Sequence, residues 1–532
     1  MRMKSRNLLL LTCTFVFNIV VAQKPLSDNV FTSIDDAQKD PEIVQMVDFH
    51  SLSLSELNQT FKYKNLLSID LSMNQFTTFP EQLFFSPKLT TISFGGNQLE
   101  ILPKRINEFT FLEHLNLENN NITTLPDEIG SLKNLQQISL YKNQLTELPE
   151  TFGQLLNLKQ LDLGRNTLKS FPKNFDKLVQ LEELNITENE FDSLPREIGA
   201  LQNLKIIVAE KNQIVSISNE IGNLNQLLSL YLGGNLLTEI PNSISNIISL
   251  QELNVTGNRL SKIPADLKNL VNLAMLSCSK NELITFPIEI CNIATLNHLE
   301  INQNKIQTIP SQISEMKAIE YLQLDDNLLQ TLPTEFGQLR TLKYVYLANN
   351  KLAEFPIALT NLSELKQLYL DQNQIITLPI EIKNLSRLQL LHLNKNKIEF
   401  IPREISAMTG LKTLTLANNL ITTLPQEFGA LIGLKMLDLE SNQIKEFPVI
   451  ITKLPNLRIL NLGHNQLTNI PSDILLLQNI EELYLGWNQL TTLPTELNNL
   501  KKLKVINLEG NTISDDEKTR IKTLLPDVQI NF

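Results

Sequence analysis

Asparagine recurs every 23 residues along this chain, from Asn74 to Asn511, without an insertion or a deletion. In all but the last repeat the Asn lies in the frame LxxLxLxxNxLxxL, with apolar residues eight, five and three positions before it and two and five positions after it, and Pro follows in eighteen repeats. A unit of this length cannot bury its own apolar residues, whereas stacked units share one continuous core. The period therefore predicts a solenoid of stacked repeats over residues 66–513.

The frame resembles the leucine-rich repeat signature. It predicts an α/β solenoid, a horseshoe with a parallel β-sheet on its concave side and short helices or 3-10 turns on its convex side. The residues before each Asn, such as Ile138 and Leu140, are expected to face inward from a short strand. The Asn follows at a turn, where a buried amide can bond backbone groups that packing would leave unpaired. We interpret this column as structural, and it includes Asn143, Asn304 and Asn373.

Both ends of the repeated segment depart from the frame, as expected where a stack must cover its apolar interior. Residues 44–57 resemble a degenerate first repeat in which Val47 and Phe49 take strand positions and Leu52 replaces the Asn. Ser514 followed by Glu517 predicts a capping box that starts a helix, and a short alternating strand follows. The expected organisation is an N-terminal extension and capping repeat at 23–65 and a C-terminal cap at 514–532.

Residues 1–22, MRMKSRNLLLLTCTFVFNIVVA, resemble a secretory signal peptide, with a basic start, an apolar stretch and small residues before Gln23. The stretch is shorter than the roughly 20 residues that a membrane span needs, so membrane insertion is not expected. A lipid on Cys13 is the alternative, which the preceding Thr12 disfavours. The leader predicts an exported protein that is secreted, at the cell surface or in the periplasm.

The chain is acidic, with a formal net charge of −11. No clustered basic face is evident in the sequence, so neither nucleic acid nor an anionic membrane is an expected partner. Cys278 and Cys291 follow the leader and stand on opposite sides of one predicted coil, so we expect two separate thiols.

The sequence gives no indication of catalysis, because a stack without insertions lacks the loops that usually build an active-site pocket. It contains no GxSxG, HExxH or CxxC motif and no phosphate-binding glycine loop. The histidines are isolated rather than spaced as metal ligands, and we interpret His298 near Glu300 as a solvated pair. We expect no enzyme activity, no cofactor and no bound metal.

The unbroken 23-residue unit with LPxEIGxLxNL, the leader, the degenerate first repeat and the ending ISDDEKTRIKTLLPDVQINF together resemble the expanded secreted leucine-rich repeat proteins of pathogenic spirochaetes. The resemblance covers nearly the whole chain. It implies a bacterial protein that binds host proteins through its concave surface, and it leaves the ligand open.

The distinguishing residues of this chain lie where side chains alternate outward on the strands. Seven of its eight tyrosines and its one tryptophan occupy such positions, and tyrosine is enriched in binding hot spots. Repeats 12–15 hold a cluster in which Tyr346, Tyr369 and His392 are expected to share one column of three successive repeats. Its flanking acids favour a partner that presents Lys or Arg, with the cation over a tyrosine face and against a carboxylate. An aromatic ladder that only stabilises cross-strand packing is a compatible alternative. The candidate ligand-binding residues of this cluster are Tyr321, Asp325, Tyr344, Tyr346, Tyr369, Asp371 and His392.

A second candidate lies nearer the C-terminus, where His464 and Trp487 share a column in adjacent repeats and each follows a glycine. These rings are either accessible to a ligand or partly covered by the cap. Both interpretations remain open at the level of the sequence.

Together these features favour a non-enzymatic protein-binding module, secreted or surface-exposed, that recognises a host extracellular or cell-surface protein. An envelope or periplasmic scaffold for another bacterial protein is the alternative. An intracellular leucine-rich repeat regulator is a third option, which the leader disfavours. Self-association through an edge or an end stays open.

We expect the mature protein to begin at or near Gln23, because small residues precede it at the end of the apolar stretch. N-terminal sequencing or the intact mass of the native protein tests this expectation. Retention of residues 1–22, or a lipid on Cys13, would contradict it.

Overall fold

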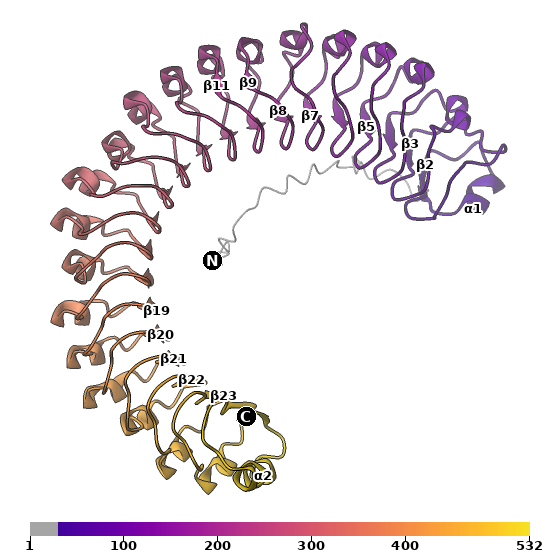
Figure 1. Cartoon of the computed structure of the whole chain (residues 1–532). Helices are drawn as coiled ribbons and strands as arrows, with labels where there is room; N and C mark the ends of the chain where they lie inside the picture. Colours follow the sequence, from indigo (N-terminus) through magenta and orange to yellow (C-terminus); the bar gives the residue numbers. More distant parts are fainter. Residues whose placement is uncertain (1–29) are drawn as a thin grey trace, which may run out of the picture. The chain divides into compact units, whose positions relative to one another are not determined.

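The computed structural model describes residues 30–532 of a chain that forms two compact units, Met1–Leu236 and Leu237–Phe532. The expected leader, residues 1–22, lies outside the described residues. Within each unit the strands lie along one side of the repeats and the 3-10 turns along the other (Figure 1).

The first unit carries a parallel sheet in which, from β3 onward, residues 23 positions apart are partners, as Ile138 and Leu161 are. Its strands are β1 (Val30–Phe31), β2 (Met46–Asp48), β3 (Ser68–Asp70), β4 (Thr91–Ser93), β5 (His114–Asn116), β6 (Gln137–Ser139), β7 (Gln160–Asp162), β8 (Glu183–Asn185), β10 (Ile206–Val208) and β12 (Ser229–Tyr231). A separate small sheet pairs β9 (Ser193–Leu194) with β11 (Ser216–Ile217). The helices are α1 (Ile34–Lys39) and the 3-10 helices η1 (Glu81–Phe85), η2 (Lys104–Glu108), η3 (Asp127–Ser131), η4 (Glu150–Gln154), η5 (Phe175–Lys177), η6 (Arg196–Ala200) and η7 (Asn219–Asn223).

The second unit repeats this arrangement, with Leu322 opposite Val345 as one example of the register. Its strands are β13 (Glu252–Asn254), β14 (Met275–Ser277), β15 (His298–Glu300), β16 (Tyr321–Gln323), β17 (Tyr344–Tyr346), β18 (Gln367–Tyr369), β19 (Leu390–His392), β20 (Thr413–Thr415), β21 (Met436–Asp438), β22 (Ile459–Asn461), β23 (Glu482–Tyr484), β24 (Val505–Asn507) and β25 (Gln529–Asn531). Its helices are η8 (Asn242–Asn246), η9 (Ala265–Asn269), η10 (Ile288–Asn292), η11 (Ser311–Glu315), η12 (Thr334–Gln338), η13 (Ile357–Asn361), η14 (Ile380–Asn384), η15 (Arg403–Ala407), η16 (Gln426–Ala430), η17 (Val449–Lys453), η18 (Ser472–Leu476), η19 (Thr495–Asn499) and α2 (Asp515–Leu524).

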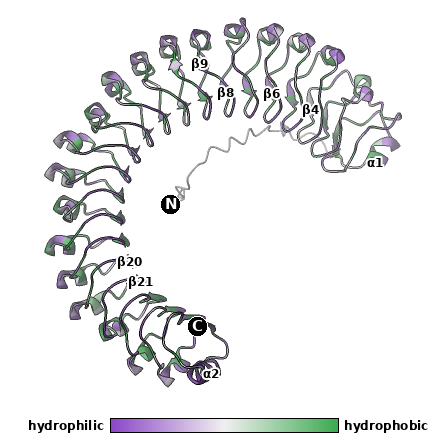
Figure 2. Ribbon diagram, viewed as in Figure 1, coloured by the Kyte–Doolittle hydropathy of each residue, from purple (hydrophilic) through white to green (hydrophobic). Residues whose placement is uncertain are grey.

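The core of each repeat consists of the apolar residues of the sequence frame. Leu135, Ile138 and Leu140 are buried, and polar and apolar residues alternate along the ribbon (Figure 2). Pro149, with a φ of −64°, directly precedes η4, where a fixed φ and a missing N–H suit the start of a helical turn. The predicted fold class, an α/β solenoid with parallel strands and 3-10 turns, is confirmed.

Each Asn of the column joins two successive repeats. The Nδ2 of Asn304 donates to the carbonyl of Ile301 at 3.1 Å in its own repeat and to that of Cys278 at 3.2 Å in the preceding one. Its Oδ1 accepts the N–H of Leu283 at 3.0 Å. Asn143 and Asn373, two other members of the Asn column, make the same three bonds to backbone groups around their own repeats. The side chain thus satisfies backbone groups that strand pairing leaves unbonded.

The residue before the Asn adopts the left-handed backbone conformation, with φ of 52° at Gln303 and 55° at Gln372. This conformation costs a non-glycine residue about 1–2 kcal/mol, and it turns the chain out of the strand so that the Asn can enter the core. Many residue types stand at this position, so the sequence pattern did not reveal it.

The N-terminal end contains two elements that the sequence did not predict, β1 and α1. Ser33 caps α1 by accepting the N–H of Asp36 at 3.3 Å. In the degenerate repeat Val47 and Phe49 are buried at strand positions, whereas Leu52, which replaces the Asn, is exposed. An apolar residue cannot make the bonds of the amide, so it is not drawn into the turn.

The C-terminal helix α2 begins at the expected cap, where the Ser514 hydroxyl accepts the N–H of Glu517 at 3.3 Å. The predicted capping box is wrong in its second half. The Glu517 carboxylate turns to the preceding repeat, accepts the N–H of Leu493 at 3.0 Å and pairs with Arg520 at 2.6 Å. This contact fastens the helix to the last repeats, and β25 then pairs with β24.

Cys278 and Cys291 are free, as expected, and both are buried. Burial raises the pKa of both thiols, so both remain protonated and unreactive at neutral pH.

We expect the substitution Asn304→Leu to lower the free energy of unfolding by about 1–3 kcal/mol, because buried backbone groups of two repeats lose their partner. Chemical denaturation measures the change. Asn297→Leu is the matched control, since Asn297 is exposed in the same repeat. Equal stability of the two variants would contradict a structural role for the column.

The pKa of Glu517 is lowered from 4.5 to about 2, first by its bond to Arg520, with smaller contributions from Thr492 and Leu493. Its ion pair therefore stabilises the fold above pH 4.5, and this contribution is lost as the pH falls towards 2. We expect the stability difference between the native chain and Glu517→Gln to shrink over that window, as measured by denaturation at each pH. The exposed Glu399→Gln is the control, and parallel profiles for the native chain and Glu517→Gln would refute the assignment.

Candidate functional site

Six aromatic side chains on the outward face of the second unit form the aromatic strip. Strand pairing places His298, Tyr321 and Tyr344 in one column across β15, β16 and β17. A second column runs across β17, β18 and β19, and the predicted sharing of this column by Tyr346, Tyr369 and His392 is confirmed. The strip consists of His298, Tyr321, Tyr344, Tyr346, Tyr369 and His392.

The rings of the strip stack on one another. The centroids of Tyr346 and Tyr369 lie 4.5 Å apart with planes at 11°, and those of Tyr369 and His392 lie 4.7 Å apart at 22°. Tyr321 joins the two columns through a tilted contact of 5.1 Å with Tyr346. Because neighbouring rings cover much of each face, the strip presents mainly ring edges and hydroxyl groups to solvent. A cation therefore has less access to the tyrosine faces than the sequence led us to expect.

His298 belongs to this strip, which the sequence reasoning missed. Its ring stacks on Tyr321 at 4.1 Å with planes at 6°, and its Nε2 lies 3.0 Å from Oε1 of Glu300. The His298 side chain is only 13 % exposed, so the expectation of a solvated pair is wrong. The sequence does carry the signal, because His298, Tyr321 and Tyr344 stand at the same frame position in three successive repeats.

Asp325 and Asp371 lie beside the strip, and both accept hydrogen bonds from backbone N–H groups. Asp325 Oδ1 accepts the N–H of Ala348 at 2.6 Å, and Asp371 Oδ1 accepts that of Asn394 at 2.9 Å. Burial raises the pKa of Asp325 to about 6 and also raises that of Asp371. Asp325 is therefore mostly ionised at neutral pH, although it gains a proton under mildly acidic conditions.

Burial also raises the pKa of Tyr321, Tyr346 and Tyr369, so their hydroxyl groups remain hydrogen-bond donors at neutral pH. The Tyr321 hydroxyl lies 3.2 Å from the side-chain oxygen of Gln323, whose nitrogen donates to Asp325 at 3.2 Å. A polar chain thus connects the rings to the neighbouring carboxylate.

His392 closes the strip towards the C-terminus. Its Nδ1 lies 3.1 Å from Oγ1 of the buried Thr415 and 3.9 Å from Oδ2 of Asp371. Burial lowers the pKa of His392, which favours the neutral ring at pH 7. Neutral imidazole suits stacking on Tyr369, and the flanking carboxylates carry the charge of the site.

The second candidate, His464 and Trp487, lies outside the strip, three repeats beyond His392. Both residues adopt positive φ, 52° and 55°, and their rings stack at 5.4 Å with planes at 7°. The other face of Trp487 covers Gly510, where a Cβ atom would lie 2.5 Å from the indole. Trp487 nevertheless remains 57 % exposed, so much of its indole ring is accessible to a ligand.

Over residues 30–236, the outward face carries no run of stacked rings comparable to the strip. Ile206 and Val208 stand at outward frame positions, but Val208 is buried. Asp162, which the sequence reasoning did not single out, is buried on this face and accepts bonds from Gly164 and Asn185 at 3.0 and 2.9 Å. Burial raises the pKa of Asp162 to about 7, and its fixed partners indicate a packing role.

Over residues 30–532, no group of three or more His, Cys, Asp or Glu side chains is placed to hold a metal ion. In the same part of the chain no helix has the length and apolar character of a membrane span.

Comparison with known proteins supports the interpretation of the repeat. Residues 97–190, 172–285 and 403–526 match the family described as a leucine-rich repeat region, and residues 294–352 and 318–375 match a second leucine-rich repeat family. A search of curated proteins found no match to the chain.

Solved structures from bacteria and a plant resemble the chain. A leucine-rich repeat protein of Leptospira interrogans is 29% identical, with 95% of this chain and 100% of that chain covered and a TM-score of 0.62. The Arabidopsis receptor kinase HAESA, solved with the peptide hormone IDA and the co-receptor SERK1, is 28% identical over 92% and 85% of the chains, with a TM-score of 0.65. An internalin of Listeria monocytogenes is 25% identical over 58% and 88%, with a TM-score of 0.52. With the family models matching more than half of its length, the chain belongs to the leucine-rich repeat family.

Proposed function

We propose that the chain is a non-enzymatic protein-binding module whose main contact surface is the aromatic strip with Asp325 and Asp371. The observation that carries the proposal is the continuous stack from His298 to His392 on the outward face. Outward side chains are not needed to bury the core, and other repeats fill the same columns with Ser, Asn or Gln. Rigid rings lose little entropy on binding, which suits them to a contact surface.

The strip favours a polypeptide ligand that offers hydrogen-bond acceptors to the tyrosine hydroxyls and a Lys or Arg to the carboxylates. Partly buried carboxylates such as Asp325 and Asp371 attract a cation more strongly than exposed ones, because water screens them less. HAESA, which is similar in fold, was solved with a peptide hormone, and this supports a polypeptide as the ligand class.

We further propose that the protein is exported and recognises a host extracellular or cell-surface protein. The leader-like residues 1–22 and the similarity to a Leptospira protein support this context. An envelope scaffold that binds another bacterial protein would use the same surface. Protease accessibility on intact cells and fractionation distinguish the two, because only an exposed protein is cleaved from outside.

Truncation of the strip should weaken binding far more than it lowers stability. The ligands for this test are peptides selected from a phage-displayed random library against the native chain. Their binding to Tyr346→Ala or Tyr369→Ala should be weaker by about 2 kcal/mol, which is roughly thirtyfold in affinity. Melting temperatures should change little, because both rings are only partly buried. Calorimetry and thermal melts measure the two quantities.

Tyr484→Ala is the matched control, since Tyr484 stands in the same column on β23, away from the strip. Thr415 would be a poor control because it is buried against His392. If the selected peptides bind all three Tyr variants equally, the strip is an aromatic ladder without a binding role. A basic residue in the ligand would show itself as a salt dependence that Asp325→Asn reduces.

A further inference from the structure

A column of basic side chains lines one edge of the sheet in the second unit. Its residues stand seven positions before the Asn of their repeats, directly before each strand. Backbone bonds connect neighbours in the column: the N–H of Lys435 donates to Lys412 and that of Arg458 to Lys435, both at 2.8 Å. We call this set the basic column, and it consists of Lys343, Lys366, Lys412, Lys435, Arg458 and Lys504.

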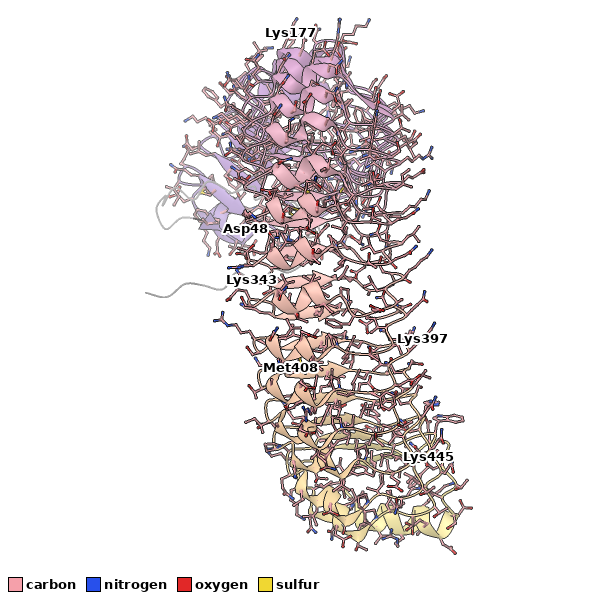
Figure 3. The ribbon with its side chains drawn as sticks, turned by 90° about the vertical axis from the view of Figure 1, so that its left-hand side faces the viewer. Asp48, Lys177, Lys343, Lys397, Met408 and Lys445 are labelled. Carbon is pink, nitrogen blue, oxygen red and sulfur yellow. The ribbon has the colours of Figure 1, made fainter. Side chains whose placement is uncertain are left out.

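The basic column lies on one flank of the unit. Figure 3 shows Lys343 on one side of the ribbon and Lys397 and Lys445 on the opposite side. The sequence showed no clustered basic face because these residues are 23 or more positions apart. Stacking places members of consecutive repeats, such as Lys412 and Lys435, roughly 4.8 Å apart, while Gln389 and Glu481 occupy the same position in two intervening repeats.

Carboxylates neutralise only part of the column. Glu320 pairs with Lys343 at 2.7 Å, while Glu481 pairs with both Arg458 and Lys504, the latter at 2.8 Å. Lys366, Lys412 and Lys435 form no ion pair with any residue from 30 to 532, although Lys412 donates to the side chain of Gln389 at 3.0 Å. The column therefore carries excess positive charge within a chain whose net charge is −11.

The fold does not require basic residues at this position. In the first unit the same frame position holds apolar, polar, acidic and basic residues, for example Leu67, Thr90, Glu113 and Lys159. Like charges on adjacent strands are unfavourable for the free chain. A ligand that carries opposite charge would relieve this repulsion.

We propose that the basic column binds an acidic, extended segment of the same polypeptide that contacts the aromatic strip. This inference rests on the proposed function, because Lys343 directly precedes Tyr344, so the column starts beside the strip and runs on towards the C-terminal repeats. The column is one residue wide, Glu481 stands within it, and Glu364, which pairs with Arg387, precedes Lys366 by two residues. A narrow row with acidic neighbours suits a linear anionic chain better than a broad membrane surface. The partner thus combines a basic residue over Asp325 or Asp371 with an acidic segment over the column.

A labelled poly-glutamate peptide tests the column directly with the full chain. The peptide should bind at low ionic strength and dissociate as salt is added. The double substitution Lys412→Gln and Lys435→Gln should weaken this binding about tenfold, as measured by fluorescence anisotropy. Lys397→Gln with Lys445→Gln is the matched control, because it removes the same charge from the opposite flank.

Equal losses in the two double variants would overturn the proposal, since binding would then follow net charge alone. Tighter binding of heparin, of a single-stranded oligonucleotide or of phosphatidylserine vesicles than of poly-glutamate would overturn the assignment to a polypeptide. Unchanged melting temperatures of the variants ensure that a loss of binding reflects charge rather than unfolding.

The proposals for the basic column and for the aromatic strip can be refuted independently of each other. Tyr346→Ala and Tyr369→Ala should leave poly-glutamate binding unchanged, because neither ring belongs to the column. If the library-selected peptides bind the tyrosine variants as tightly as the native chain, the aromatic strip is not their contact surface. Loss of poly-glutamate binding in the tyrosine variants would overturn the separate role of the column.

Discussion

The hydrogen bonds of the buried Asn amide are the interaction on which the rest of this structure depends. One side chain, such as that of Asn304, bonds carbonyl groups of two successive repeats and an N–H of the earlier one. These bonds offset the free-energy cost of the left-handed backbone conformation at Gln303, and they hold the turn by which the chain leaves the strand. Stability is therefore built between neighbours, and each repeat depends on the next for its own backbone partners.

Because inward residues and the Asn column maintain the fold, the outward residues of the strands are free to vary. The second unit uses this freedom twice, in the aromatic strip and in the basic column beside it. The strip is partly buried by its own stacking, which holds the rings in place and leaves their edges and hydroxyl groups for contact. The two surfaces differ in chemistry, so a partner that matches both would be selected by shape and by charge pattern.

The sequence alone predicted part of the aromatic strip, because a strict period converts frame position directly into spatial register. It predicted that Tyr346, Tyr369 and His392 share a column. It did not predict that the rings would cover each other's faces, that His298 would join them, or that Asp325 would bond the N–H of Ala348. Those features depend on side-chain rotamers and on contacts between repeats, which a period does not specify.

By itself the sequence determined the fold class, the inward residues and the place of the Asn column, since all three follow from the 23-residue spacing of apolar residues around Asn. Tertiary structure decided the rest. It turned the Glu517 carboxylate from the expected N–H of Ser514 to that of Leu493, buried Val208, and assembled a basic edge from residues that are 23 or more positions apart in the sequence. The physical reason is that local spacing specifies which face a residue occupies, whereas burial and charge depend on neighbours that only stacking supplies.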